Sequence, residues 1–247
     1  MKPADRQFIG VANDKGGVGK SLTAALIAEY LGSTHPTTVV EIEQRSNFTQ
    51  TLYRRPEPVD LQTLALIVHD EASNRDRPSL SPLDSLWDFI PKTPQESRRL
   101  IVDFGASAFQ SFFMWGRDHR GLQPFRGAEF KFTFFVPVQA SDIECAQFFN
   151  LTAPTLLKLG NVVLIRNLRE GTDFSMLNQK LVEQVPSLTL LHRGRPLVTE
   201  LQQPNQRLTF RQLAAFEGAS RRARLDAEDC AEHFETQFEQ IRAKLGI

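Results

Sequence analysis

Short apolar runs alternate with longer amphipathic stretches along the chain. Each short run is rich in Val, Ile, Leu or Phe and is bounded by polar, Gly or Pro positions, which is typical of buried strands. The longer stretches repeat apolar residues every three or four positions, which predicts helices. Strands are expected at 7–12, 38–42, 100–104, 131–138, 161–165 and 188–191, and helices at 21–31, about 61–71, 106–117, 142–159, 174–185 and twice near the C-terminus.

This alternation predicts an α/β fold with a mostly parallel sheet flanked by helices on both faces. Residues 73–96 are the least regular part, because they contain four prolines. We interpret this segment as an irregular surface excursion and not as a domain boundary, so residues 1–247 are expected to form a single domain. Its C-terminal helices are expected at about 209–246.

The last predicted helix has one apolar face, on which Phe234, Phe238, Ile241 and Leu245 follow a helical spacing. Packing of this face into the core is the favoured interpretation. An anchor on a membrane surface is the alternative, but membrane-binding helices usually have a basic polar face. The polar face of this helix is acidic, so membrane binding is not expected.

The composition is that of an ordinary soluble globular protein, with 41% hydrophobic and 23% charged residues among 247. It excludes collagen-like, disulfide-stapled and natively disordered classes. A membrane-length apolar run and a signal-like N-terminus are both missing from the sequence, so a cytoplasmic protein is expected. The two cysteines, Cys145 and Cys230, are far apart and suggest neither a disulfide framework nor a zinc site.

Charge is unevenly distributed along the C-terminal third, where a basic segment is followed by an acidic one, although the 29 basic and 29 acidic residues balance over the whole chain. Residues 193–224 contain seven arginines against Glu200 and Glu217, a net charge of +5. Residues 225–247 have a net charge of −4. The guanidinium group suits bidentate recognition of phosphate, so the first of these segments is a candidate phosphate-binding surface.

Residues 13–23, with the sequence NDKGGVGKSLT, lie between the first strand and the first helix. Closely spaced glycines allow backbone N–H groups to converge on phosphate oxygens, and the helix N-terminus adds partial positive charge. Lys20 supplies a full charge, and the Ser21 hydroxyl can bind Mg²⁺. The residues expected to bind the nucleotide here are Lys15, Gly16, Gly17, Val18, Gly19, Lys20, Ser21 and Leu22.

Two departures from the usual phosphate loop are informative: Asp14 replaces the first glycine, and Lys15 is an additional lysine. The combination K-G-G-x-G-K-[ST] after a strand resembles the deviant Walker A loop of the ParA/MinD family of ATPases. The resemblance implies that Lys20 holds the phosphates of its own nucleotide. It also implies that Lys15 reaches the partner's phosphates across a nucleotide-sandwich dimer, so an ATP-dependent homodimer is expected.

Residues 41–49, after the second strand, are similar to the switch I pattern D-x-D-P-Q-G-N-x-T of that family, with direct matches at Asn47 and Thr49. Both aspartates are replaced by glutamates. The resemblance gives Glu43 the role of positioning the attacking water and Glu41 a supporting role near the metal. One extra methylene moves a carboxylate by more than about an ångström, so hydrolysis is expected to be slow or its geometry rearranged. The alternative is a pair of strand-end carboxylates in solvent.

The strand at 100–104 ends in Asp103 and is followed by Gly105, which resembles the Walker B and switch II segment. A carboxylate there accepts hydrogen bonds from Mg²⁺-bound water, and the glycine permits a rearrangement when the γ-phosphate leaves. The resemblance thus implies ATP and Mg²⁺ as cofactors. The implied catalytic residues are Lys15, Lys20, Glu43 and Asp103, and the implied metal site consists of Ser21, Glu41 and Asp103.

Two later segments complete the resemblance, which thins out after about residue 170. Residues 135–141 are similar to the strand and loop beside the γ-phosphate. Asn167 falls where relatives often place a polar side chain on the adenine, and an asparagine that caps a loop is an equally acceptable interpretation. ParA-type proteins that segregate DNA bind it non-specifically as ATP dimers through basic residues towards the C-terminus. The corresponding candidates are Arg207, Arg211, Arg221, Arg222 and Arg224.

The resemblance favours a ParA-like ATPase that closes into an ATP dimer, binds nucleoid DNA and is reset when an activating protein stimulates hydrolysis. That partner would be of the centromere-binding type or a cargo adaptor, and the cargo a plasmid, a chromosome origin or another large assembly. One alternative is a nucleotide-gated scaffold that scarcely hydrolyses ATP. A MinD-like membrane-associated ATPase is another. For the basic segment, a solvated helix face neutralised by the acidic helix remains an alternative to DNA binding.

Overall fold

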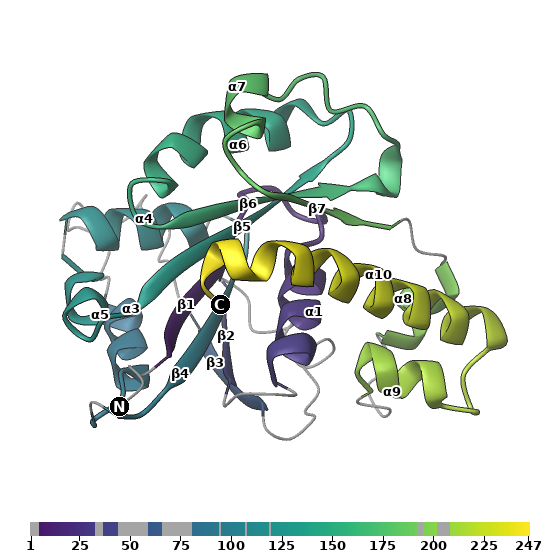
Figure 1. Cartoon of the computed structure of the whole chain (residues 1–247), viewed down its shortest axis with the longest axis horizontal. Coiled ribbons are helices and arrows are strands. Elements are labelled where there is room, and N and C mark those ends of the chain that lie inside the picture. Colours follow the sequence, from purple (N-terminus) through teal and green to yellow (C-terminus); the bar gives the residue numbers. More distant parts are fainter. Residues whose placement is uncertain are drawn as a thin grey trace, which may run out of the picture.

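The computed structural model describes residues 5–32, 37–43, 59–65, 81–93, 95–106, 108–118, 120–191, 195–201 and 208–247. In this part of the chain, seven strands form one sheet in the order β3-β2-β4-β1-β5-β6-β7, and every pairing is parallel. The predicted fold class, a parallel sheet between helices, is confirmed (Figure 1). The strands are β1 (Arg6–Val11), β2 (Thr37–Glu43), β3 (Val59–Ala65), β4 (Arg98–Phe104), β5 (Lys131–Gln139), β6 (Asn161–Asn167) and β7 (Ser187–Leu190).

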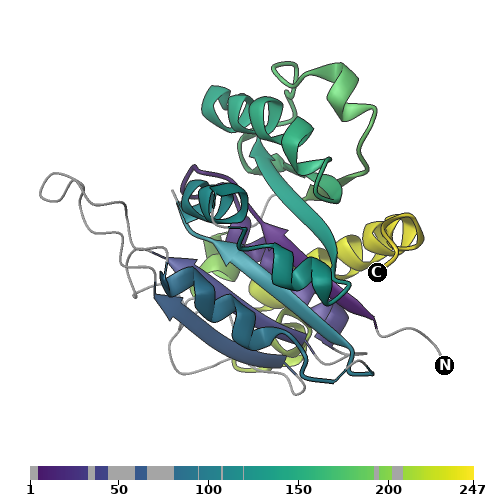
Figure 2. The same ribbon diagram turned by 90° about the vertical axis from the view of Figure 1, so that its left-hand side faces the viewer.

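Helices cover both faces of this sheet because each face carries its own apolar core (Figures 1 and 2). The first core is covered by α3 (Ser81–Asp84), η1 (Ser85–Phe89), α4 (Ala108–Asp118), α5 (Gln123–Gly127), α6 (Ile143–Leu156) and α7 (Gln179–Val182). The second core is covered by α1 (Lys20–Gly32), α8 (Arg195–Leu201), α9 (Phe210–Ala215) and α10 (Arg221–Leu245). A short 3-10 helix, η2 (Leu168–Glu170), follows β6.

Aromatic side chains fill much of both cores. On the first face, the ring of Phe8 from the central strand contacts Phe112, Phe125 and Phe132 at centroid distances of 5.3–5.6 Å. On the second face, Phe238 of α10 stacks on Phe135 of β5. The four apolar residues of the last predicted helix, Phe234, Phe238, Ile241 and Leu245, are all buried there. Core packing of this helix is therefore the correct interpretation.

The structure corrects three expectations. A helix was expected from about 61, but residues 59–65 form an edge strand paired in parallel with β2. Only Gln179–Val182 is helical within the expected helix 174–185, because Asn178 caps the helix there by accepting a hydrogen bond from the Lys180 amide. Part of the segment 73–96 is regular, since α3 and η1 occupy its middle; residues 73–80 lie outside the described residues.

Candidate nucleotide site

β1 and β5 are neighbouring parallel strands, and the chain leaves their carboxyl ends towards opposite faces of the sheet. The helix that follows β1 packs on one face of the sheet, and α6, which follows β5, packs on the other. In open α/β sheets this change of side leaves a crevice beyond the strand ends, where ligands bind. The glycine-rich loop after β1 lies at that crevice, as the sequence predicts.

The loop adopts a conformation that its glycines allow. Gly17 and Gly19 have φ angles of +77° and +99°, in a backbone region that residues with a Cβ atom rarely adopt. At the end of the loop, Lys20 begins α1, and its Nζ donates a hydrogen bond to the Lys15 carbonyl oxygen at 2.6 Å. The ammonium group therefore lies across the loop, at the N-terminus of a thirteen-residue helix. Helix N-termini and ammonium groups both favour bound anions.

Two buried asparagines hold the loop against the neighbouring strands. Asn13 accepts a hydrogen bond from the Lys15 amide at 2.9 Å and donates one to the Pro137 carbonyl oxygen at 2.8 Å. Asn167, at the end of β6, donates to the Val18 carbonyl oxygen at 2.9 Å. These bonds tie the loop to β5 and to β6, so its shape is set by tertiary contacts as well as by its own sequence.

Asn167 also accepts a hydrogen bond from the Arg169 amide, which makes it the cap of η2. The Asn167 residue is buried, with 1% of its surface exposed. The interpretation as a capping asparagine thus describes the structure, and its amide also supports the phosphate loop. A contact with adenine stays a prediction.

Lys15 forms ion pairs with two carboxylates at the start of α6. Its Nζ lies 2.7 Å from Asp142 Oδ2 and 3.1 Å from Glu144 Oε2. The hydrogen bond to Asp142, followed by that to Glu144, raises the pKa of the Lys15 ammonium. Burial raises the pKa of Asp142, but the bonds from Lys15 and from the Cys145 amide outweigh this effect and leave it lowered. Within one copy of the chain, Lys15 is therefore held by its own subunit.

Two acidic side chains lie buried on adjacent strands beside the loop. Glu41 of β2 and Asp103 of β4 are register partners, and each is 1% exposed. Asp103 is also the register partner of Val11, the last residue of β1, which places it next to the start of the loop. After β4, the Gly105 amide donates to the Ile42 carbonyl oxygen at 2.8 Å and ties the switch II-like segment to β2.

The donor set fits Mg²⁺, which prefers oxygen ligands and is usually held by one or two carboxylates together with phosphate oxygens. Ser21 in the first turn of α1, Glu41 and Asp103 supply one hydroxyl and two carboxylates. Among the described residues, no group of three or more His, Cys, Asp or Glu side chains could hold a metal alone. Phosphate oxygens of a bound nucleotide would complete the ligands of such an ion.

Part of the switch I-like segment lies outside the residues that the structure describes. The backbone of Glu43 ends β2, whereas its side chain and the matched Asn47 and Thr49 lie outside the described residues. The proposed role of Glu43 in positioning water therefore stays a prediction.

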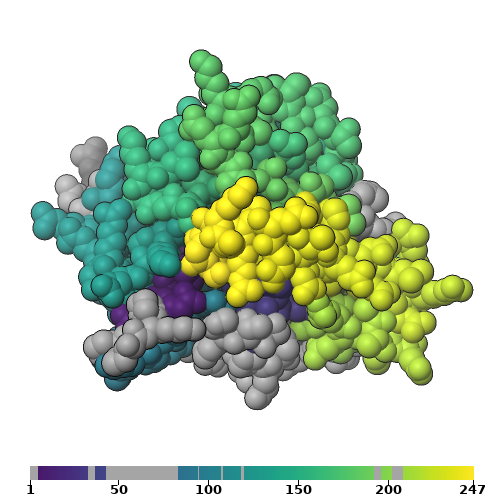
Figure 3. Space-filling model, in the orientation of Figure 1, coloured from purple at the N-terminus to yellow at the C-terminus, as the bar shows by residue number. Residues whose placement is uncertain are grey.

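Four of the basic candidates belong to α9 and α10, namely Arg211 to α9 and Arg221, Arg222 and Arg224 to α10. Figure 3 shows the surface of these two helices in yellow-green and yellow. Arg211 pairs with Glu235, and Arg222 lies 2.8 Å from Asp226. Arg221 is exposed, and Arg224 is half-buried. Arg207 lies outside the described residues. The structure thus shows some internal neutralisation of this surface, as the alternative interpretation expects, while the side chains of Arg211 and Arg222 remain 62% and 71% exposed.

Sequence reasoning missed the partners of Lys15 and the role of Asn13. Asp142 immediately precedes α6 and accepts a hydrogen bond from the Cys145 amide, so a helix cap was readable from the sequence. Its pairing with a residue of the first loop was not readable, because that pairing depends on β1 and β5 being neighbours. Within the described residues, no helix is long and apolar enough to cross a membrane.

No protein-family model and no curated protein matches the chain. Solved structures do match over nearly its whole length. A ParA family ATPase from Chlorobium tepidum TLS covers 93% of this chain and 98% of its own, at 15% identity and a TM-score of 0.54. A protein described as a plasmid partition protein of Borrelia burgdorferi B31, bound to AMPPNP, covers 97% and 99%, at 14% identity and a TM-score of 0.56.

A variant of McdA from Cyanothece in complex with ATP covers 99% of this chain and 98% of its own. Its identity is 14% and its TM-score 0.54. At such identities the likeness concerns the fold alone. The resemblance seen in the sequence is confirmed to that extent, because the structural neighbours are ATPases of the ParA/MinD group.

Proposed function

We propose that this chain, which has the fold of the ParA-type ATPases, binds ATP with Mg²⁺ and acts as a nucleotide-dependent dimerisation switch. One observation carries the proposal. A glycine-rich loop with two lysines lies at the carboxyl edge of the sheet. The buried carboxylate of Asp103 is on the adjacent strand, and that of Glu41 is on the strand after it. Candidate phosphate-binding cations and candidate metal-binding acids thus lie at the same edge of the sheet.

Different residues of the site are proposed to bind the phosphates and the metal ion. Lys20 exchanges its bond to the Lys15 carbonyl oxygen for phosphate oxygens, and the amides of the loop and the first turn of α1 donate to the same phosphates. Ser21, Glu41 and Asp103 would hold a Mg²⁺ ion, which would neutralise charge on the phosphates. Bound ATP supplies the phosphoanhydride bond whose cleavage resets the switch.

Lys15 acts between subunits. In one copy of the chain it is paired with Asp142 and Glu144. These pairs are partly exposed to solvent, and such pairs contribute little to stability, so they can be given up for a partner's phosphates. Dimerisation then involves an exchange of partners for Lys15.

Hydrolysis is proposed to be slow without an activating protein. Glu43 would position the attacking water, with a longer side chain than the aspartate usual in this family. A nucleotide-gated scaffold with little hydrolysis is the second candidate function, because Glu41 and Glu43 both carry the extra methylene. A MinD-like membrane role is disfavoured, since the apolar face of α10 is buried in the core.

DNA is the proposed partner of the ATP dimer, through phosphate contacts from Arg211, Arg221, Arg222 and Arg224. Arg207, the fifth candidate, lies outside the described residues. Such contacts are independent of sequence and sensitive to salt. Positioning or partition of a cargo such as a plasmid or chromosome origin, with an adaptor protein as activator, follows from the same proposal.

Light scattering with ATP, ADP or no nucleotide, each with Mg²⁺, tests the switch. We expect a dimer with ATP alone, and we expect Lys15→Ala to bind ATP but remain a monomer. A Lys15→Ala protein that dimerises like the parent would contradict the proposed role. The same three nucleotide states, measured for retention on DNA, test the DNA surface.

Single-turnover hydrolysis separates the two candidate functions. Rapid γ-phosphate loss in the presence of DNA and an activating protein excludes the scaffold. Hydrolysis that stays slow under all conditions supports it.

A further inference from the structure

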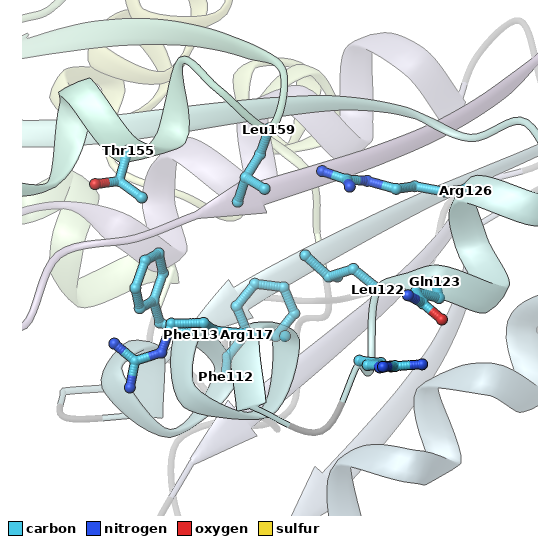
Figure 4. A pocket seen from close by; sticks show the side chains of 10 residues that line it. Phe112, Phe113, Arg117, Leu122, Gln123, Arg126, Thr155 and Leu159 are labelled. Carbon is cyan, nitrogen blue, oxygen red and sulfur yellow. The ribbon is translucent and has the colours of Figure 1, made fainter.

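A cavity of about 340 Å³ lies between the C-terminal part of α4, the segment that leads into α5, and the end of α6 (Figure 4). Thr155 and Leu159 face Phe112, Phe113 and Leu122 across it. The cavity lies on the sheet face that is covered by α4 and α6, at the end of α4 distant from Asp103. Its volume falls within the range of small-molecule sites.

Arginines surround this apolar cavity. Arg117, Arg120 and Arg126 all line it, and no carboxylate of the described residues does. Arg120 and Arg126 are exposed and form no ion pair within the described part of the chain. In Figure 4 the Arg126 side chain extends across the cavity towards Leu159. Positive charge is therefore concentrated at an apolar hollow without an acidic side chain in its lining.

The turn that carries Arg120 is fixed by the two tryptophans of the chain. The Gly121 amide donates to the Trp115 carbonyl oxygen at 3.1 Å, and Trp87 Nε1 donates to the Gly121 carbonyl oxygen at 2.9 Å. A Cβ atom at Gly121 would overlap the Trp115 ring. Arg120 itself has a φ angle of +54°, a conformation unfavourable for a residue with a side chain. The turn is thus held in an unusual conformation that places Arg120 at the cavity.

We propose that this cavity is a binding site for an organic anion with an apolar body, such as a carboxylate on an alkyl or aromatic group. The guanidinium groups would bind the anionic end through charge-assisted hydrogen bonds. The apolar body would be buried against Phe112, Phe113, Leu122 and Leu159. Because α4 begins five residues after Asp103, the ligand contacts the helix that follows the switch II-like segment.

Isothermal titration calorimetry with octanoate and with 1-octanol tests the site on the full chain. We expect octanoate to bind with a Kd below about 1 mM and octanol to bind at least about tenfold more weakly, because only octanoate has an anionic end. Trp87 and Trp115 are the only tryptophans and lie beside the cavity turn, so octanoate should also change the intrinsic fluorescence. Equal binding of octanoate and octanol would overturn the proposal.

Single substitutions in the cavity lining test whether octanoate binds there. Arg120→Gln and Arg126→Gln should each weaken octanoate binding about fivefold to tenfold. Leu159→Trp should abolish it by filling the cavity. The matched control is Lys158→Gln, which removes an exposed positive charge from the same turn as Leu159 without lining the cavity. Equal affinity in Arg120→Gln, Arg126→Gln and the control would overturn the site.

A free small molecule and a segment of a partner protein can both present this chemistry. An acetylated and amidated Glu-Leu-Phe-Glu peptide, titrated beside octanoate, distinguishes the two sources. Arginine-dependent binding of either probe supports the site, and the tighter probe indicates the source. Failure of both probes to bind overturns the proposal.

Discussion

Alanine substitutions at the three glycines of the phosphate loop should destabilise the protein in a graded order. At Gly19, φ is +99°, and a Cβ atom would lie 3.0 Å from Asn167 Nδ2 and 3.3 Å from Leu190 Cδ1. At Gly17, φ is +77°, but the space around a Cβ atom is open. At Gly16, φ lies outside the left-handed region, and the space is also open.

The expected magnitudes follow from these differences. A side chain in the left-handed region costs about 1 to 2 kcal/mol, so Gly17→Ala should lower the free energy of unfolding by about that amount. Gly19→Ala also disturbs the bond from Asn167 to Val18, worth about 0.5 to 1.5 kcal/mol, and should cost about 2 to 3 kcal/mol in total. Gly16→Ala, the matched control, should change stability by less than about 0.5 kcal/mol.

Thermal unfolding of the nucleotide-free variants measures this order. For a chain of this size, Gly19→Ala should lower Tm by about 4 to 12 °C. If Gly16→Ala lowered Tm as much as Gly19→Ala, the loop conformation and the support from Asn167 would both be refuted.

Three other predictions concern single side chains. Asp142→Asn removes the nearer acidic partner of Lys15, so ATP-dependent dimerisation should begin at a lower protein concentration in light scattering; an unchanged onset would contradict this. Burial raises the pKa of Glu29, so the folded state keeps the Glu29 proton to a higher pH than the unfolded state does. In urea titrations, the free energy of unfolding of the parent relative to that of Glu29→Gln should therefore fall, not rise, as the pH increases above about 4.5. Burial raises the pKa of the Cys145 thiol to about 11, so maleimide should label it at pH 8 far more slowly in the native protein than in urea, and equal rates would argue against its burial.

The phosphate loop could be predicted from the sequence because its chemistry is local. Strand, glycines, Lys20 and helix follow one another without interruption, and the structure keeps that order. Asp103 could be placed for the same reason, since it ends an apolar strand. The α/β fold followed from the alternation of short and long periodic runs.

Features that depend on which strands are neighbours could not be predicted. Lys15 meets Asp142 only because β1 and β5 pair. A helix was expected at about 61–71 because that stretch fills a gap between two predicted strands, but pairing with β2 makes Val59–Ala65 a strand. The cavity beside Arg120 is formed by segments distant in the sequence, and its left-handed turn has no local signature in the sequence.

Calorimetric titration of ATP into the folded chain in magnesium buffer tests the central claim most directly, namely that residues 13–21 bind a triphosphate. The account predicts saturable heat of binding for the parent, and its loss in Lys20→Ala, whose circular dichroism should match that of the parent. An absence of heat with the folded parent protein, or equal binding by folded Lys20→Ala, would contradict it.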